Sequence, residues 1–169
     1  MSERVAIVAG AGGELGRATV QKLAAAGFTV VGVDRNEQAL KELPDGIRRE
    51  AADPADPASA RSVVDQIAAE VGPPEVLVNT IGAYRLGEAL TAAPEDLRLM
   101  IDVNLGPALW LTQAVAPYLR ERGSGSIVHV AARPAWSRPP GWPPTPSARP
   151  PWSTSPACST CSCARSESG

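Results

Sequence analysis

The stretch from residue 4 to residue 34 constrains the fold most, because it joins two apolar strands through a glycine-rich turn and a helix. The pattern predicts a buried strand at RVAIVAG, the turn at AGGELG, a helix at RATVQKLAAAG and a second strand at FTVVGVD. The turn carries Gly10, Gly13 and Gly16. Because glycine lacks a Cβ, the chain can bend tightly there and a diphosphate can approach the backbone. The helix that follows would present free N–H groups and the positive end of its dipole to that diphosphate.

An acidic residue, Asp34, ends the second strand about twenty residues after the turn. A carboxylate at this place can accept hydrogen bonds from both hydroxyls of an adenosine ribose. The glycines lie between a strand and a helix with the acid in register, so the pattern predicts a dinucleotide site. The alternative is a plain glycine turn that caps a helix in a β-α-β unit.

Size and charge narrow the classes of protein to which the chain can belong. Its 169 residues match one domain with a substantial core. The net charge of −2 and the lack of a basic stripe argue against nucleic acid as a partner. The sequence shows neither a secretory signal nor an apolar run long enough for a membrane span. We therefore expect a cytoplasmic protein without a membrane partner.

Cysteines and histidines are few and badly placed for a structural or metal role. All three cysteines, Cys158, Cys161 and Cys163, fall in the last dozen residues, so they form no disulfide framework. A zinc site requires about four ligands, and the one histidine, His129, lies inside a predicted strand. We expect His129 to be a packed or edge residue and expect no metal site.

The composition changes abruptly near residue 133. Residues 133–169 contain no Val, Leu, Ile, Phe, Tyr, Met, Lys or Asp, but hold nine of the 17 prolines and three of the four tryptophans. A stretch without aliphatic side chains larger than alanine cannot offset the entropy lost on folding. The sequence therefore predicts a dinucleotide-binding domain at 1–132 and a disordered or low-complexity tail at 133–169.

Strands and helices alternate along residues 1–132. Five predicted strands are separated by helical segments, and the order β-α-β-α-β-α-β-α-β predicts an α/β fold with right-handed crossovers. We expect a Rossmann-like, doubly wound parallel sheet of five strands in the order 3-2-1-4-5, with helices on both faces. Ligands of such sheets bind beyond the carboxyl ends of the strands. The glycine turn and the polar residues that follow later strands all fall there: Asp34, Asp53, Asn79 and Gly82.

Residues 1–132 resemble the N-terminal half of a short-chain dehydrogenase/reductase. The matching segments are VAGAGGELG, VGVDR, AADPADPAS, LVNTIG, DVNLGPALWLTQAVAPYLRERGSG and SIVHVAA. The resemblance implies an NAD(P)-dependent oxidoreductase that transfers hydride between nicotinamide and a small carbonyl or alcohol substrate, usually as a homo-oligomer. It implies cofactor contacts for Gly10, Gly13, Leu15, Gly16, Asp34, Arg35, Asp53, Asn79 and Gly82, and a place in the catalytic set for Asn104.

Two residues at the end of the second strand bear on the choice of cofactor. The carboxylate of Asp34 repels a 2′-phosphate and favours NAD, whereas the neighbouring Arg35 could accept the 2′-phosphate of NADP. The chain also departs from the family pattern at Pro54, which lacks an N–H for adenine, and at Thr80 and Ile81 in LVNTIG.

The resemblance fails where the catalytic acid should be. The family uses a tyrosine as acid and base, a lysine that lowers its pKa, and a serine that holds the substrate oxygen. Ala132 stands at the serine position, no tyrosine follows Tyr118, and no lysine follows Lys41. The chain as written is therefore expected to be a truncated, inactive enzyme, and the alternative is a non-catalytic dinucleotide-binding or interaction protein.

The tail has two further interpretations. One is that residues from about 135 onward are translated in a shifted reading frame, because joining the third base of each codon to the next two bases permits the missing segment. Pro144–Thr145 then permits Tyr, and Ala148–Arg149 permits Lys four codons later. The other is a polyproline II ligand, based on the P-x-x-P spacings of RPPGWPPTPSARPP.

Overall fold

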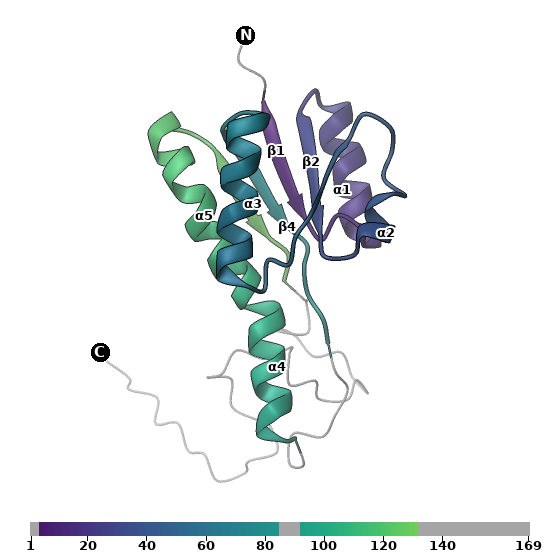
Figure 1. Cartoon of the computed structure of the whole chain (residues 1–169), viewed down its shortest axis with the longest axis vertical. Helices are drawn as coiled ribbons and strands as arrows, with labels where there is room; N and C mark the ends of the chain where they lie inside the picture. The colour runs from purple at the N-terminus through teal and green to yellow at the C-terminus, as the bar shows by residue number, and fades with distance from the viewer. Residues whose placement is uncertain (1–3, 85–91, 132–169) are drawn as a thin grey trace, which may run out of the picture.

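The computed structural model describes residues 4–84 and 92–131, which form a sheet covered by helices on both faces (Figure 1). Five parallel strands lie in the order β3-β2-β1-β4-β5, which confirms the predicted fold class and strand order. The strands are β1 (Val5–Ala9), β2 (Thr29–Asp34), β3 (Arg48–Ala51), β4 (Pro74–Asn79) and β5 (Ser126–His129). The helices are α1 (Glu14–Ala25), α2 (Glu37–Leu40), α3 (Pro57–Glu70), α4 (Pro94–Asn104) and α5 (Gly106–Arg122).

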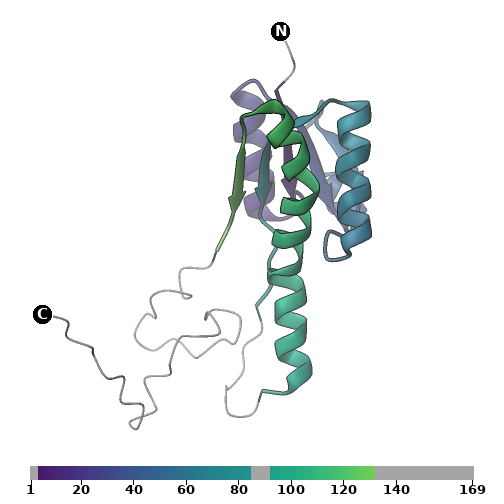
Figure 2. The ribbon, with the colours of Figure 1, turned by 90° about the vertical axis from the view of Figure 1, so that its left-hand side faces the viewer.

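The central strand β1 divides the apolar core into two parts. All five of its residues are buried, and successive side chains of a strand point to opposite faces of the sheet. Val5, Ile7 and Ala9 pack in the cluster beneath α3 and α5, whereas Ala6 and Val8 pack with side chains of α1 and α2. The two layers of helices on either side of the sheet are visible in Figure 2. Burial on both faces explains why Val5–Ala9 is apolar at every position, without alternation.

Local signals set most of the helix boundaries. The side chain of Asn36 accepts hydrogen bonds from the N–H groups of Gln38 and Ala39, and the side chain of Asp56 accepts one from Ser59 at the start of α3. The sequence predicts a long, mostly helical stretch over residues 94–123, eased by Gly106 and Pro107. The structure interrupts it at Leu105, next to these two residues, and so divides it into α4 and α5. In the described part of the chain, we find no helix with the length and hydropathy of a membrane span.

Three polar side chains, Arg61, Asp65 and Tyr118, connect α3 to α5 on one face of the sheet. The Tyr118 hydroxyl donates a hydrogen bond of 2.7 Å to Asp65 Oδ1, and Arg61 Nε donates one of 2.8 Å to Asp65 Oδ2. The hydrogen bond from Arg61 is the main cause of the lowered pKa of Asp65. The hydrogen bond to Asp65 is in turn the main cause of the raised pKa of Tyr118. Both directions favour the ionised carboxylate and the neutral phenol.

Replacing Tyr118 with phenylalanine is expected to lower the free energy of unfolding by about 1 kcal/mol. The variant loses one hydrogen bond between helices but keeps the ring, which packs against the core beneath α3 and α5. Urea unfolding measures the change, and Arg61→Gln is the matched control because its ion pair with Asp65 lies within one helix. A Tyr118→Phe protein as stable as the wild type would show that α3 and α5 are held by apolar packing alone.

Candidate functional site

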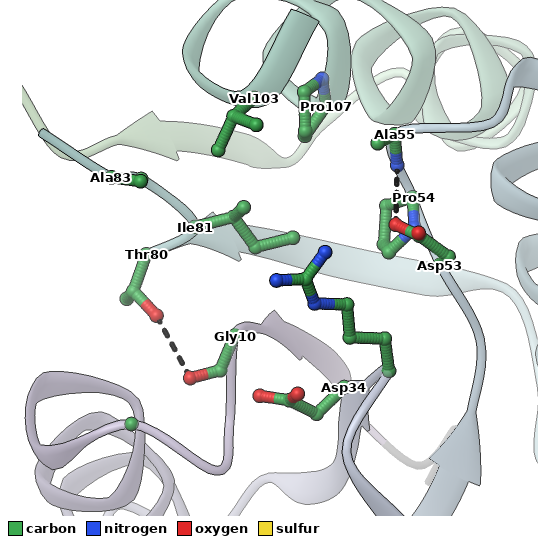
Figure 3. A pocket seen from close by; sticks show the side chains of 13 residues that line it. Gly10, Asp34, Asp53, Pro54, Ala55, Thr80, Ile81, Ala83, Val103 and Pro107 are labelled. Atoms are coloured by element: carbon green, nitrogen blue, oxygen red, sulfur yellow. Dashed lines mark hydrogen bonds between the residues drawn. The ribbon is translucent and has the colours of Figure 1, made fainter. Parts of the chain in front are cut away.

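A pocket of about 230 Å³ opens beyond the carboxyl ends of the strands (Figure 3). Each wall follows a strand end or the junction of α4 and α5, so segments far apart in sequence meet here. Its lining comes from the turn after β1 (Gly10, Gly13), the end of β2 (Asp34, Arg35), the loop after β3 (Asp53, Pro54, Ala55), the loop after β4 (Thr80, Ile81, Gly82, Ala83), and α4 and α5 (Val103, Pro107).

The glycines of the first turn are required for different reasons. Gly10 has a φ of +78°, and a Cβ built there would lie 2.7 Å from Thr80 Oγ1. A Cβ on Gly16 would lie 2.1 Å from the carbonyl oxygen of Gly10, because α1 packs directly on the turn. A Cβ on Gly12 would lie 2.6 Å from the Cβ of Ala39. The fold itself therefore excludes side chains at these three positions.

Gly13 differs from the other glycines of the turn. A Cβ there would meet only the carbonyl oxygen of Gly10, at 3.4 Å, and the φ of −77° is open to any residue. Gly13 is also the N-cap of α1, and no side chain caps this helix end. The protein's own packing therefore leaves room at Gly13, on the wall of the pocket and at the positive end of a helix dipole.

The carboxylate of Asp34 is held by two backbone groups. Its Oδ2 accepts a hydrogen bond of 2.9 Å from the N–H of Gly12, and its Oδ1 accepts one of 2.9 Å from the N–H of Asn36. Each carboxylate oxygen still has a second lone pair for a ligand hydroxyl. The adjacent Arg35 lines the pocket, is exposed, and makes no hydrogen bond or ion pair within the described residues.

The loop after β3 forms the adjoining wall. Asp53 Oδ1 accepts a hydrogen bond of 3.0 Å from the N–H of Ala55, while the N–H of Asp53 donates to Ser59 Oγ at 3.2 Å. The segment IRREAAD predicts a strand that ends at Asp53, but β3 ends at Ala51, so this predicted end is wrong. Asp53 instead lies in a turn that leads into α3. This turn, with Pro54 at its centre, brings the residue to the pocket.

The loop after β4 is anchored from two directions. Thr80 Oγ1 donates to the carbonyl oxygen of Ala9 at 2.9 Å, which ties the end of β4 to the end of β1. On the other side, Asn104 Oδ1 accepts a hydrogen bond of 3.1 Å from the N–H of Ala83, and Asn104 Nδ2 donates to the carbonyl oxygen of Met100. A Cβ on Gly82 would lie 3.2 Å from Asn104 Oδ1, which explains the glycine.

Not every expected site residue reaches the pocket. Asn79 is 3% exposed, and its amide lies beneath the loop, with Oδ1 accepting the N–H of Ile81 at 3.0 Å. Leu15 and Gly16 are also absent from the lining, and the Leu15 side chain is half exposed on α1. Asn104 acts through Ala83 without lining the pocket itself. Ala132, the position expected for a serine, lies outside the described residues.

Sequence reasoning missed two contributors to this site. Gly12 supplies the N–H that orients Asp34, and only its place beside Gly13 in the glycine turn signalled it. Thr80, noted above as a departure from the family pattern, bonds the turn after β1 through its hydroxyl. Each role depends on a contact between distant segments, 22 residues apart for Gly12 and Asp34 and 71 residues apart for Thr80 and Ala9.

Comparisons with known proteins agree with this geometry. A family model described as short chain dehydrogenase matches residues 4–144. A short chain dehydrogenase of Pseudocercospora fijiensis is 37% identical over 147 residues, which cover 80% of this chain and 47% of that protein. The D-threitol dehydrogenase of Mycolicibacterium smegmatis is 32% identical over 139 residues, which cover 78% of this chain and 54% of that protein.

Solved structures give the same result. A short-chain dehydrogenase from Streptomyces avermitilis aligns with a TM-score of 0.75 at 32% identity, covering 81% of this chain and 52% of that one. The ligand-free aldohexose dehydrogenase of Thermoplasma acidophilum aligns with a TM-score of 0.72 at 26% identity, covering 79% and 51%. The chain thus spans about half the length of the relatives it matches. With its strand order, its glycine turn and the matched residues, the chain belongs to the short-chain dehydrogenase family.

Proposed function

We propose that this chain binds a nicotinamide dinucleotide and forms the cofactor half of an oxidoreductase acting on a small carbonyl or alcohol. The observation that carries the proposal is the pairing, on one pocket wall, of the open space at Gly13 with the fixed carboxylate of Asp34. A diphosphate requires close approach to backbone at a helix N-terminus, and an adenosine ribose requires a hydroxyl acceptor beside it. Related proteins named as dehydrogenases support the same class of reaction.

The residues of the pocket fit such a cofactor without rearrangement of the turn. Gly13 and the uncapped start of α1 would face the diphosphate, and Asp34 would accept from the ribose hydroxyls. The loop after β3, at Asp53, would hold the adenine, while Ile81 and Gly82 would lie beside the ribose. When bound, the nicotinamide supplies or accepts the hydride. The chain's own residues bind, orient and shield the cofactor from water.

Asn104 is the recognisable member of the catalytic set, and its two amide atoms are both used. Oδ1 holds the N–H of Ala83, and Nδ2 holds the carbonyl oxygen of Met100. We therefore assign Asn104 the task of fixing the loop after β4 against the pocket. Through Ala83 it acts as a positioning residue in this part of the chain.

NAD is the cofactor that we expect to bind more tightly. The carboxylate of Asp34 is fixed by Gly12 and Asn36, so it cannot easily turn away from a 2′-phosphate. Two negative groups a few ångströms apart at a protein surface repel each other by about 1 kcal/mol or more. The cation of Arg35, which has no ion pair among the described residues, opposes this repulsion without removing it, because its side chain is exposed and screened.

Substitutions at these two neighbouring residues test the proposal. The wild-type chain is expected to bind NADH about tenfold more tightly than NADPH, a difference of about 1.4 kcal/mol. Asp34→Ser should weaken NADH and strengthen NADPH, so that the ratio of the two dissociation constants falls towards one. Arg35→Ala is the matched control and should weaken NADPH alone. Binding is measured by the fluorescence of the reduced nicotinamide, and absent binding of either nucleotide would refute the proposed function.

A second candidate function rests on the absence of a catalytic tyrosine and lysine from residues 119–169. A chain without these residues could bind a dinucleotide as a sensor or interaction module, with no turnover. Both candidates predict binding of NADH, and they differ in whether carbonyl reduction follows. Oxidation of NADH in the presence of ketones and aldehydes therefore separates the two candidates.

A further inference from the structure

The single histidine of the chain, His129, ends β5, which is an edge strand of the sheet. It lies directly opposite Asn79, the last residue of β4, in the strand register. Its Nδ1 is 3.4 Å from Asn79 Nδ2, and its Nε2 is 3.0 Å from Thr112 Oγ1 on α5. His129 therefore bridges β4 and α5 through both of its ring nitrogens.

The orientation of the Asn79 amide decides which nitrogen of His129 carries the proton. Asn79 Oδ1 accepts the backbone N–H of Ile81 at 3.0 Å, so the amide nitrogen must face the ring. An amide nitrogen only donates, and the Nδ1 of His129 must therefore accept and carry no hydrogen. The proton of the neutral ring lies on Nε2.

The opposite side of the ring agrees with this tautomer. Thr112 Oγ1 donates its hydrogen to the carbonyl oxygen of Ala108 at 2.6 Å, which leaves the oxygen to accept from His129 Nε2. One directional chain of hydrogen bonds thus runs from the N–H of Ile81 through Asn79 and His129 to α5. Its first member, Ile81, lines the pocket.

A second proton on the ring would break this chain. Protonated Nδ1 donates, and so does the facing Asn79 nitrogen, so the two groups would repel each other. Turning the amide over would satisfy the ring but would leave the N–H of Ile81 facing another N–H. The amide can serve either Ile81 or a protonated His129, but not both.

We propose that neutral His129 is a positioning residue for the pocket, and that its protonation releases the loop at Ile81 and weakens dinucleotide binding. The inference rests on the proposed function, since it concerns the regulation of the same pocket. It adds a response to pH in the range in which histidine changes charge.

The surroundings of His129 favour its neutral form. His129 is exposed on the edge strand, and partial burial of its ring lowers its pKa. β4 and α5 pack against it, and the charged residues of α5 lie at its far end, at Arg120, Glu121 and Arg122. The one charged residue of β4, Glu75, is paired with Arg4 and Arg122. The stability that the lowered pKa contributes is complete above the ordinary histidine pKa of about 6.5, and it is lost as the pH falls below that value and through the lower pKa of the folded protein.

Nitrogen-15 and proton NMR of the full chain, made without a histidine tag, can observe the ring directly because there is one histidine. At pH 7.5 we expect the tautomer with hydrogen on Nε2, and a pKa below about 6.5. Saturating adenosine diphosphate ribose, which stays ionised over this range, should lower that pKa by about 0.7 unit, equal to fivefold coupling. A tautomer with hydrogen on Nδ1, or a His129 pKa that is the same with and without the ligand, would overturn the proposal.

Calorimetric binding of adenosine diphosphate ribose provides the second readout. The wild-type affinity should fall about twofold to threefold between pH 7.5 and pH 5.5, because the full fivefold effect is reached only below the pKa of the bound state. In His129→Asn, an amide oxygen can accept from Asn79 at every pH, so the affinity ratio between the two pH values should be about one. A variant that keeps the wild-type ratio contradicts the role of His129. Absent binding at pH 7.5 would instead refute the proposed function itself.

Discussion

Replacing Gly16 with alanine is expected to lower the melting temperature by roughly 10 °C. The new Cβ would lie 2.1 Å from the carbonyl oxygen of Gly10 and 2.8 Å from the Cα of Ala11, and both are backbone atoms. Neither can move aside without pulling α1 away from the turn after β1. Overpacking of this kind costs typically about 1–3 kcal/mol, and each kcal/mol shifts the melting temperature by several degrees in a domain of this size.

Gly13→Ala is the matched variant, three residues away in the same turn. Its Cβ would meet only Gly10 O at 3.4 Å, so the cost in stability should be about 1 kcal/mol or less, from the poorer N-cap. The added methyl group should nevertheless occupy the space that we assign to the diphosphate, and NADH should bind at least about tenfold more weakly. Both variants are measured by thermal unfolding, which reports the loss of packing, and by nicotinamide fluorescence, which reports the loss of NADH binding. Equal NADH affinity in Gly13→Ala and wild type would remove the main support for the diphosphate position.

The second large effect concerns turnover. The chain as written should bind NADH and yet reduce ketones at least about 10²-fold to 10⁴-fold more slowly than a variant with a catalytic tyrosine, which is the usual contribution of a general acid. No tyrosine follows Tyr118 and no lysine follows Lys41, so no group of those types in the tail can protonate the substrate oxygen. The measurement is oxidation of NADH with a panel of ketones and aldehydes.

We propose a direct comparison with a variant whose codons from about 135 onward are read in the alternative frame. That frame permits Tyr at Pro144–Thr145 and Lys at Ala148–Arg149, with the four-residue spacing that places both on one helix face. Turnover gained by the frame-shifted variant would support the proposed oxidoreductase function. Brisk turnover by the chain as written would contradict the expectation that it is inactive without the catalytic tyrosine and lysine. NADH binding without turnover in both proteins would favour the non-catalytic module.

The parallel α/β architecture was predictable because the relevant information is local. β1 is apolar at all five positions, which places it at the centre of the sheet, and each α-helical connection requires a right-handed parallel crossover. Boundaries were less predictable at β3, where Arg48–Ala51 is partly polar and ends two residues before Asp53. A short edge strand is defined by its neighbour's hydrogen bonds more than by its own residues.

The site was predictable as a set of positions but not as a set of contacts. Gly10, Gly13, Asp34 and Asp53 follow strand ends in the sequence, and parallel strands bring those ends together. Asn79 follows the same rule, yet its amide turns inward to Ile81 and His129. Side-chain direction at a strand end depends on which partner atoms lie within hydrogen-bond distance, and those partners come from other segments.

The amino-acid sequence alone determined the α/β class and the glycine turn, because apolar periodicity and the missing Cβ act within a few neighbouring residues. Only the tertiary structure decided that Gly12 orients Asp34, that Thr80 joins β4 to β1, and that His129 accepts from Asn79. Each of these bonds joins residues between 22 and 71 positions apart. Such contacts depend on distances that the folded sheet creates, which no local pattern of residues encodes.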